Sequence, residues 1–100
     1  MVVWTESAKA DLRAIHDFIA HDSCYYAKKV TQDIREKMDG LDEFQKMGRI
    51  VPEINDDLVR ELSLYSYRII YEIKDQTIFI LAVVHQRRNL KGDDVSREAS

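Results

Sequence analysis

The fold of this chain is decided by residues 67–88, which read YRIIYEIKDQTIFILAVVHQRR. The first part of this stretch alternates, so that one side carries Tyr67, Ile69, Tyr71 and Ile73 and the other carries Arg68, Ile70 and Glu72. A period of two residues is typical of a β-strand with one face buried. We therefore predict a strand from Tyr67 to Ile73, which ends at the turn residues Lys74-Asp75-Gln76.

Residues 78–84 form an apolar run with β-branched residues on both sides of the strand pattern. The run is too short to span a membrane, and such a run is typical of a central strand covered on both faces. It ends at His85, and Arg87 and Arg88 follow. A cationic group at the end of a rigid strand is well placed for function, because the backbone beneath it is held firmly.

Composition limits the classes of function. The chain has 100 residues, 45% hydrophobic and 33% charged, which fits one globular domain. Its net charge of −3 disfavours a protein whose whole surface grips nucleic acid, since phosphate binders usually carry a basic excess. Any basic surface of this chain must therefore be local.

The cysteine and histidine content indicates neither disulfides nor metal. Cys24 is the single cysteine, which excludes an intrachain disulfide and favours a reducing compartment. No signal-peptide pattern opens the chain, so we expect a cytoplasmic protein without a membrane segment. His16 and His21 have no metal-ligand spacing to other side chains, and we expect no metal and no cofactor.

Two helices are predicted near the amino terminus, after a short candidate strand at residues 2–4. Thr5 is a suitable N-cap for a helix over residues 6–20, and Asp22 or Ser23 can cap a second helix. Each helix has an apolar stripe at helical spacing. The stripes comprise Ala8, Leu12, Ile15 and Ile19, with Phe18 beside them, and Ala27, Val30, Ile34, Met38 and Leu41. The short link between the helices predicts an antiparallel hairpin.

A long surface connection is expected over residues 42–57, where periodicity fades and Gly48, Pro52 and an Asn-Asp-Asp run occur. A strand should follow from Leu58 to Leu64, with a turn at Tyr65-Ser66 before the Tyr67 strand. Arg60 falls on the more apolar side of this strand, either as a long stem reaching solvent at its edge or as a site residue.

The expected order is strand, two helices, three strands, which predicts a two-layer α+β domain with the helix hairpin on a mostly antiparallel sheet. We assign residues 1–88 to this single domain. Residues 89–100 are polar with alternating charge, and we expect them to form a C-terminal tail.

Several segments together resemble the RelE/ParE superfamily of bacterial type II toxins, and the resemblance extends to Arg88. The segments are Trp4-Thr5, Ala8, Asp11-Leu12, Ile15 and Phe18-Ile19, residues 48–53 (GRIVPE), Arg60-Glu61-Leu62, residues 67–72 (YRIIYE) and residues 85–88 (HQRR). The resemblance implies a toxin with the fold expected above, held inactive by a small antitoxin. Its members divide between ribosome-dependent messenger-RNA endonucleases of the RelE kind and DNA gyrase poisons of the ParE kind.

The nuclease alternative needs a base, an acid and cations over the phosphate. Some RelE-like nucleases carry a comparable set, which implies Glu53 as base, His85 as acid, and Arg60, Arg68 or Arg87 as phosphate clamps. The competing interpretation treats Arg68 as a strand-surface charge, Glu53 as a loop carboxylate and His85 as the end of a strand.

The gyrase alternative is favoured by the acidic charge balance. It is also favoured by residues 85–88 and by the opening around Trp4, Asp11-Leu12 and Phe18-Ile19, which look more like the ParE branch. On this interpretation Arg87 and Arg88, with His85 beside them, recognise carboxylates or phosphates of the gyrase–DNA complex, and no residue is a catalyst.

Antitoxin binding is the partner expected in either case. A sheet with apolar side chains on both faces needs cover on the face that the helices do not reach, and a segment that folds on contact can supply it. We expect Ile70, Leu81 and Val83 to take part in that surface or lie just beneath it, and Trp4 to contribute to antitoxin binding.

Overall fold

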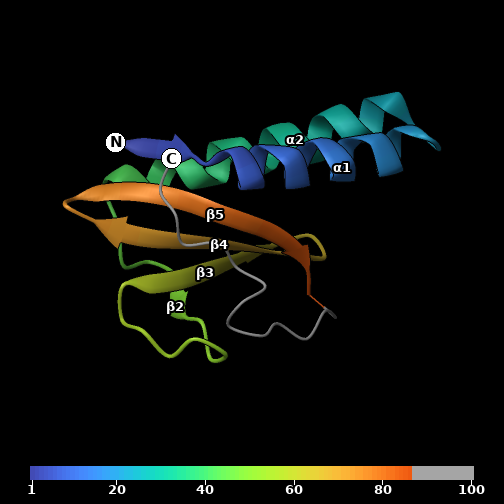
Figure 1. The fold of residues 1–100 in the computed structure, drawn as a ribbon. Coiled ribbons are helices and arrows are strands. Elements are labelled where there is room, and N and C mark those ends of the chain that lie inside the picture. Colours follow the sequence, from blue (N-terminus) through green and yellow to red (C-terminus); the bar gives the residue numbers. More distant parts are fainter. Residues whose placement is uncertain (87–100) are drawn as a thin grey trace.

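The computed structural model of the chain describes residues 1–86. It has two layers, with a pair of helices lying side by side over one face of a five-stranded sheet (Figure 1). The elements are β1 (Val2–Trp4), α1 (Glu6–Ala20), α2 (Cys24–Asp39), the short 3₁₀ helix η1 (Gly40–Asp42), β2 (Arg49–Ile50), β3 (Val59–Leu64), β4 (Tyr67–Lys74) and β5 (Thr77–His85). The predicted α+β class and element order are confirmed.

The sheet has the strand order β1-β5-β4-β3-β2. β1 pairs with β5 in parallel, and the other neighbouring pairs are antiparallel. β5 is therefore an inner strand, as its apolar sequence predicts. β2 was not expected. It is two residues long, too short to produce a periodic pattern, and it adds a fifth strand at one edge inside the predicted surface connection.

The helices begin at the predicted caps. The Thr5 side chain accepts a hydrogen bond from the backbone N–H of Ala8 at 3.2 Å, and its hydroxyl donates to the carbonyl of Ile80 at 2.7 Å. Ser23 caps α2 by accepting from the N–H of Tyr26 at 3.1 Å. Thr5 thus caps α1 and also fastens its start to β5, so the helix pair has a fixed position over the sheet.

Tight turns set the antiparallel register. Asp75 and Gln76, between β4 and β5, have φ of 51° and 64°, and Tyr65, between β3 and β4, has φ of 56°. Two consecutive residues with positive φ suit the right-handed twist of the strands they join. The predicted turns at residues 65–66 and 74–76 are therefore confirmed.

The core has two clusters, one on each face of the sheet. The helix-side cluster is formed by the helix stripes and by Ile69, Tyr71, Ile73, Ile78, Ile80 and Val83. The far-side cluster, on the other face, contains Val51, Val59, Ile70, Leu81, Ala82 and Val84, with Ile54 and Phe79 packed against it. Both faces of β5 are covered, as its sequence predicts.

A β-bulge in β5 changes the side to which the end of the strand points. Ile70 pairs with Ala82 and Tyr71 pairs with Ile80, so Leu81 is the extra residue. An extra residue reverses the alternation after it. Leu81 lies in the far-side cluster, but Val83 lies in the helix-side cluster. The expected placement of Val83 on the same face as Leu81 is wrong for this reason.

Candidate functional site

The most concentrated group of buried charge lies on the far face of the sheet. Arg68 of β4 is 7% exposed and Glu61 of β3 is 1% exposed. Glu61 pairs with Ile70, and Arg68 pairs with Ser63. Because residues paired across strands share a face, both charged side chains lie on the face of Ile70, away from the helices. The interpretation of Arg68 as a strand-surface charge is therefore wrong, since the side chain is buried.

Arg68 is held by two carboxylates. Its Nη1 and Nη2 donate to the two carboxylate oxygens of Glu53 at 2.8 and 2.9 Å. Nε donates a short hydrogen bond to Glu61, and Nη2 donates to Glu61 at 3.1 Å. The hydrogen bonds that Arg68 donates raise its pKa, with the bonds to Glu53 contributing most and those to Glu61 next. The guanidinium stays charged and its donors are directed at the protein's own carboxylates.

Arg49 of β2 completes this group. Its Nε donates to Glu61 at 3.0 Å, while most of the Arg49 side chain is exposed. We call Arg49, Glu53, Glu61 and Arg68 the far-side charge network. Three of its members, Arg49, Glu53 and Arg68, line an open hollow of about 520 Å³ together with Pro52, Ser63 and Gln86. The network as a whole contains two cations and two carboxylates, so its formal charges balance, with Glu61 buried beneath the hollow.

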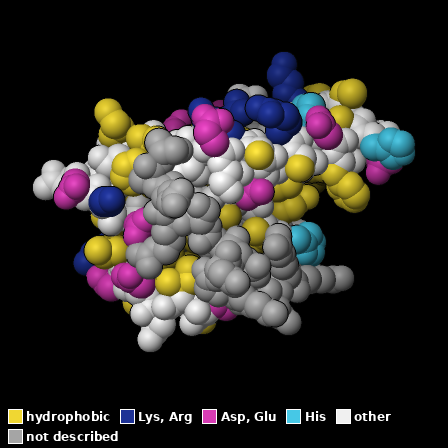
Figure 2. Space-filling view, viewed as in Figure 1, with side chains coloured by type: hydrophobic (Ala, Val, Ile, Leu, Met, Phe, Trp, Pro, Cys, Tyr) yellow, Lys and Arg dark blue, Asp and Glu magenta, His cyan; other side chains and the backbone are white. Residues whose placement is uncertain are grey.

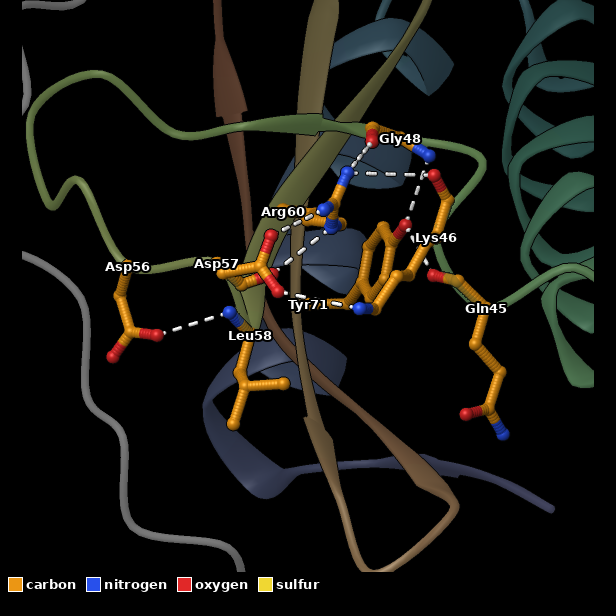
Figure 3. A network of polar contacts seen from close by, with 8 residues as sticks. All are labelled: Gln45, Lys46, Gly48, Asp56, Asp57, Leu58, Arg60 and Tyr71. Atoms are coloured by element: carbon orange, nitrogen blue, oxygen red, sulfur yellow. Dashed lines mark hydrogen bonds and ion pairs between the residues drawn. The ribbon is translucent and has the colours of Figure 1, made fainter.

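Arg60, which is next to Glu61 in β3 but on the helix side of the sheet, has a structural role (Figure 3). Its Nε and Nη2 donate to the backbone carbonyl and the carboxylate of Asp57 at 3.0 and 2.7 Å, and Nη1 donates to the carbonyl of Gly48 at 2.8 Å. Asp57 also accepts from Lys46 at 3.3 Å, and the bonds from Lys46 and then Arg60 lower the pKa of Asp57. These bonds give Arg60 a structural role in fastening a loop, and its side chain is 14% exposed instead of reaching freely into solvent.

Tyr71 of β4 also fastens this loop, through its hydroxyl group (Figure 3). Its hydroxyl donates to the carbonyl of Gln45 at 2.8 Å and accepts from the N–H of Gly48 at 3.0 Å. Burial raises the pKa of Tyr71. Gly48 lies so close that a Cβ there would come within 2.5 Å of the carbonyl oxygen of Glu61. This close approach allows β2 to pair with β3.

His85 lies on the opposite face from Arg68. It pairs with Tyr67 across the sheet, and the two rings meet edge to face with centroids 5.9 Å apart. Tyr67 packs against the helix-side cluster. The four nuclease candidates are therefore separated: Glu53 and Arg68 meet on the far face, while Arg60 and His85 lie on the helix side, Arg60 on β3 and His85 at the end of β5.

The remaining predicted residues are placed as follows. Ile70 and Leu81 are fully buried in the far-side cluster, and Trp4 is partly buried against the helix-side cluster on the edge strand β1. Arg87 and Arg88, and the tail at 89–100, lie outside the described residues. Within residues 1–86, no His, Cys, Asp and Glu side chains are grouped to hold a metal ion. No helix in the same range is long and apolar enough to cross a bilayer.

Sequence reasoning missed Glu61 as a central residue of the site. The available signal was positional. Glu61 is two residues from Val59 and Arg68 is two residues from Ile70, so each shares a face with an apolar neighbour, and the carboxylate and the guanidinium lie on the same covered face of adjacent strands. Opposite charges on one buried face of neighbouring strands predict an ion pair. Arg49 and Glu53 come from the loop segment that resembles the superfamily.

Comparisons with known proteins agree with the fold. A family model described as "ParE toxin of type II toxin-antitoxin system, parDE" matches residues 2–90. Toxin RelE2 of Caulobacter vibrioides is 32% identical over 87 residues, which cover 87% of this chain and 96% of the relative. A solved chain of the chromosomal ParDE TA system from P. aeruginosa matches with a TM-score of 0.70 and 30% identity, over 84% of this chain and 92% of that one.

The helix hairpin on a mixed five-stranded sheet is thus the fold of a toxin of the RelE/ParE superfamily. Within that superfamily, the chain belongs to the ParE toxin family of type II toxin–antitoxin systems. Membership of such a system implies a protein antitoxin as partner.

Proposed function

We propose that this toxin inhibits DNA gyrase by binding rather than by catalysis, and that a cognate antitoxin neutralises it. The observation that carries the proposal is the separation of the nuclease candidates. Cleavage of RNA at a 2′-hydroxyl needs a base, an acid and a cation within hydrogen-bond reach of one phosphodiester. Here Glu53 and Arg68 bond to each other on the far face, and His85 lies on the helix side of the sheet.

The state of each nuclease candidate also supports binding over catalysis. Arg68 has its donors directed at Glu53 and Glu61, and Arg60 donates to a loop and to Asp57. Releasing Arg68 to clamp a phosphate would leave a Glu61 that is 1% exposed without its main cation, which is costly. Clamping a substrate would thus require breaking contacts that hold the sheet together.

The residues proposed to contact gyrase are Arg87 and Arg88, with His85 at the end of β5. His85 is exposed, and β5 is the inner strand between β1 and β4, so its end is firmly positioned. Arginine forks that follow such a strand suit bidentate contacts to carboxylates or phosphates of a gyrase–DNA complex. The match to the ParE family model is consistent with this target.

The alternative function is a ribosome-dependent messenger-RNA endonuclease, and the name of the Caulobacter relative favours it. One comparison separates the two: supercoiling by purified gyrase, and messenger-RNA cleavage on translating ribosomes, each with the free toxin. We expect loss of supercoiling and uncut messenger RNA. Ribosome-dependent cuts that disappear in Glu53→Gln and His85→Ala variants would replace the proposal with the nuclease.

We further propose that the antitoxin covers the far face of the sheet. Phe79 and Ile54 are partly exposed there, above Ile70 and Leu81. An apolar antitoxin segment packed on Phe79 would bury this surface. Trp4 packs on the helix side of the edge strand β1, so it would contact an antitoxin that continues around this edge of the sheet. Co-expression of the antitoxin with a Phe79→Ser toxin tests the surface. Weaker co-purification is expected, and unchanged co-purification would place the antitoxin elsewhere.

A further inference from the structure

A cationic groove runs between the two helices. It is lined by Lys9, Leu12, Arg13, His16, Lys28, Thr31 and Arg35, and its volume is about 430 Å³. Figure 2 shows Lys and Arg side chains gathered over the helix hairpin. In the part of the chain that the structure describes, no Asp or Glu lines the groove, although the whole chain carries a net charge of −3.

The groove follows from the helical repeat. Lys9, Arg13 and His16 project from α1 at intervals of four and three residues, and Lys28 and Arg35 are seven residues apart on α2. Residues spaced in this way share one helix face. Leu12 and Thr31, which are buried, lie between the two cationic rows and form the floor. Because α1 and α2 are antiparallel neighbours, the rows face each other.

The cations of the groove are mostly not neutralised within the described chain. Lys9 pairs with Glu6 at 3.4 Å, on an exposed surface where such a pair is weak. Among residues 1–86, no carboxylate forms an ion pair with Arg13, Lys28 or Arg35. This is the reverse of the far-side charge network, where each cation faces a carboxylate.

We infer that this groove binds the phosphate backbone of duplex DNA without reading sequence. Each row is about 10 Å long, at 1.5 Å per residue over seven residues. Duplex DNA presents one negative charge per roughly 1.7 Å of its axis, so such a length offers about six phosphates to the four Lys and Arg side chains. Long flexible cations without fixed neighbours suit phosphate contacts that position a protein.

Two features favour duplex DNA over other polyanions. The described lining residues include no Phe, Tyr or Trp, so the bases of a single strand would have no aromatic side chain among them on which to stack. Among the lining residues within positions 1–86, Leu12 is the only one with an aliphatic side chain, and it is 2% exposed, so an acidic protein segment would find no apolar anchor there. The hydroxyl of Thr31 donates to the carbonyls of Ala27 and Lys28, which leaves the floor without a free donor for base edges.

The test is binding of the purified full-length toxin to a random-sequence duplex DNA of 20 base pairs, followed by fluorescence anisotropy over a range of salt. Four phosphate contacts predict that log K falls with log salt with a slope of about −3.6. Arg13→Gln/Arg35→Gln should reduce the slope to about −1.8. The matched control, Lys37→Gln/Lys74→Gln, removes the same charge from exposed positions outside the groove and should keep the wild-type slope.

Three outcomes would overturn the inference: no binding of wild-type toxin at low salt, equal loss of slope in both double variants, or tighter binding of a single strand or a polyglutamate chain of equal charge. Circular dichroism of both variants verifies that they are folded. The inference does not depend on gyrase as the target, because the assay contains no gyrase. Its failure would leave the proposed function standing, and failure of the supercoiling assay would not affect this groove.

Discussion

Arg68 forms two parallel hydrogen bonds, 2.8 and 2.9 Å long, with the carboxylate of Glu53, fifteen residues earlier in the chain. The pair joins β4 to the loop after β2, and Glu61 holds the same guanidinium from β3. Three segments of the far face are thus fastened through one side chain. This bond ties together the two residues that a nuclease would need as base and phosphate clamp.

Replacing Arg68 should destabilise the protein strongly. An Arg68→Met variant leaves the buried carboxylate of Glu61 with only the exposed Arg49 as partner, and loss of one member of a buried pair costs about 3–5 kcal/mol. Glu53→Gln is the matched control, since the Glu53 side chain is partly exposed. Urea unfolding measures both free energies. A loss below about 1 kcal/mol in Arg68→Met would show that the network does not stabilise the fold.

Gly48→Ala should destabilise the edge of the sheet. The added Cβ would lie 2.5 Å from the carbonyl oxygen of Glu61 and 2.8 Å from the hydroxyl of Tyr71, so backbone must move. Overpacking of this kind costs about 1–3 kcal/mol. Gly40→Ala is the control, because nothing lies within 4 Å of its Cβ position. If both variants unfold at the same urea concentration, the close approach of β2 to β3 is not as described.

Alkaline pH should weaken the contact between Tyr65 and Asp33. The hydrogen bond that Tyr65 donates to Asp33 raises the pKa of Tyr65 to about 12, from 10.0. Because the folded pKa is the higher one, the contact contributes stability fully below pH 10 and loses it as the pH rises through about 12. Ultraviolet titration of the tyrosines, with Tyr65→Phe as the assignment control, should show this late step.

Asp33→Asn provides the converse experiment on the same pair. Without the carboxylate, the pKa of Tyr65 should fall back toward its ordinary value, and the late ionisation should lose the contribution of Tyr65 while that of Tyr71, whose pKa is raised by burial, remains. A late ionisation of the same amplitude in wild-type and Asp33→Asn protein would show that Asp33 does not raise the pKa of Tyr65.

Most of the fold was predictable because each local pattern agrees with the tertiary structure. The caps at Thr5 and Ser23, the helix stripes and the alternation in β4 all appear in the sequence and are confirmed. Strong local periodicity is reliable when the same apolar stripe is buried in the fold. The burial of both faces of β5 was likewise predictable, because its sequence is apolar on both sides.

Two features had no local signal. The bulge at Leu81 lies in a run that is apolar on both faces, so no polar residue marks where the alternation reverses, and Val83 was assigned to the wrong face. β2 forms because Gly48 allows a close approach to β3. This is a tertiary contact, and the two residues of β2 are too few to show a periodic pattern that would predict it. The burial of Arg68 likewise depends on carboxylates from two other segments.

The central claim is inhibition of gyrase by contacts rather than by chemistry, and the most direct measurement is supercoiling of relaxed plasmid by purified gyrase with increasing toxin. We predict that wild-type and Glu53→Gln toxin both stop supercoiling and that Arg87→Ala/Arg88→Ala does not, while the control Lys37→Ala/Lys74→Ala still does. Supercoiling that continues unchanged at excess wild-type toxin, in a preparation that cuts messenger RNA on ribosomes, would contradict the claim.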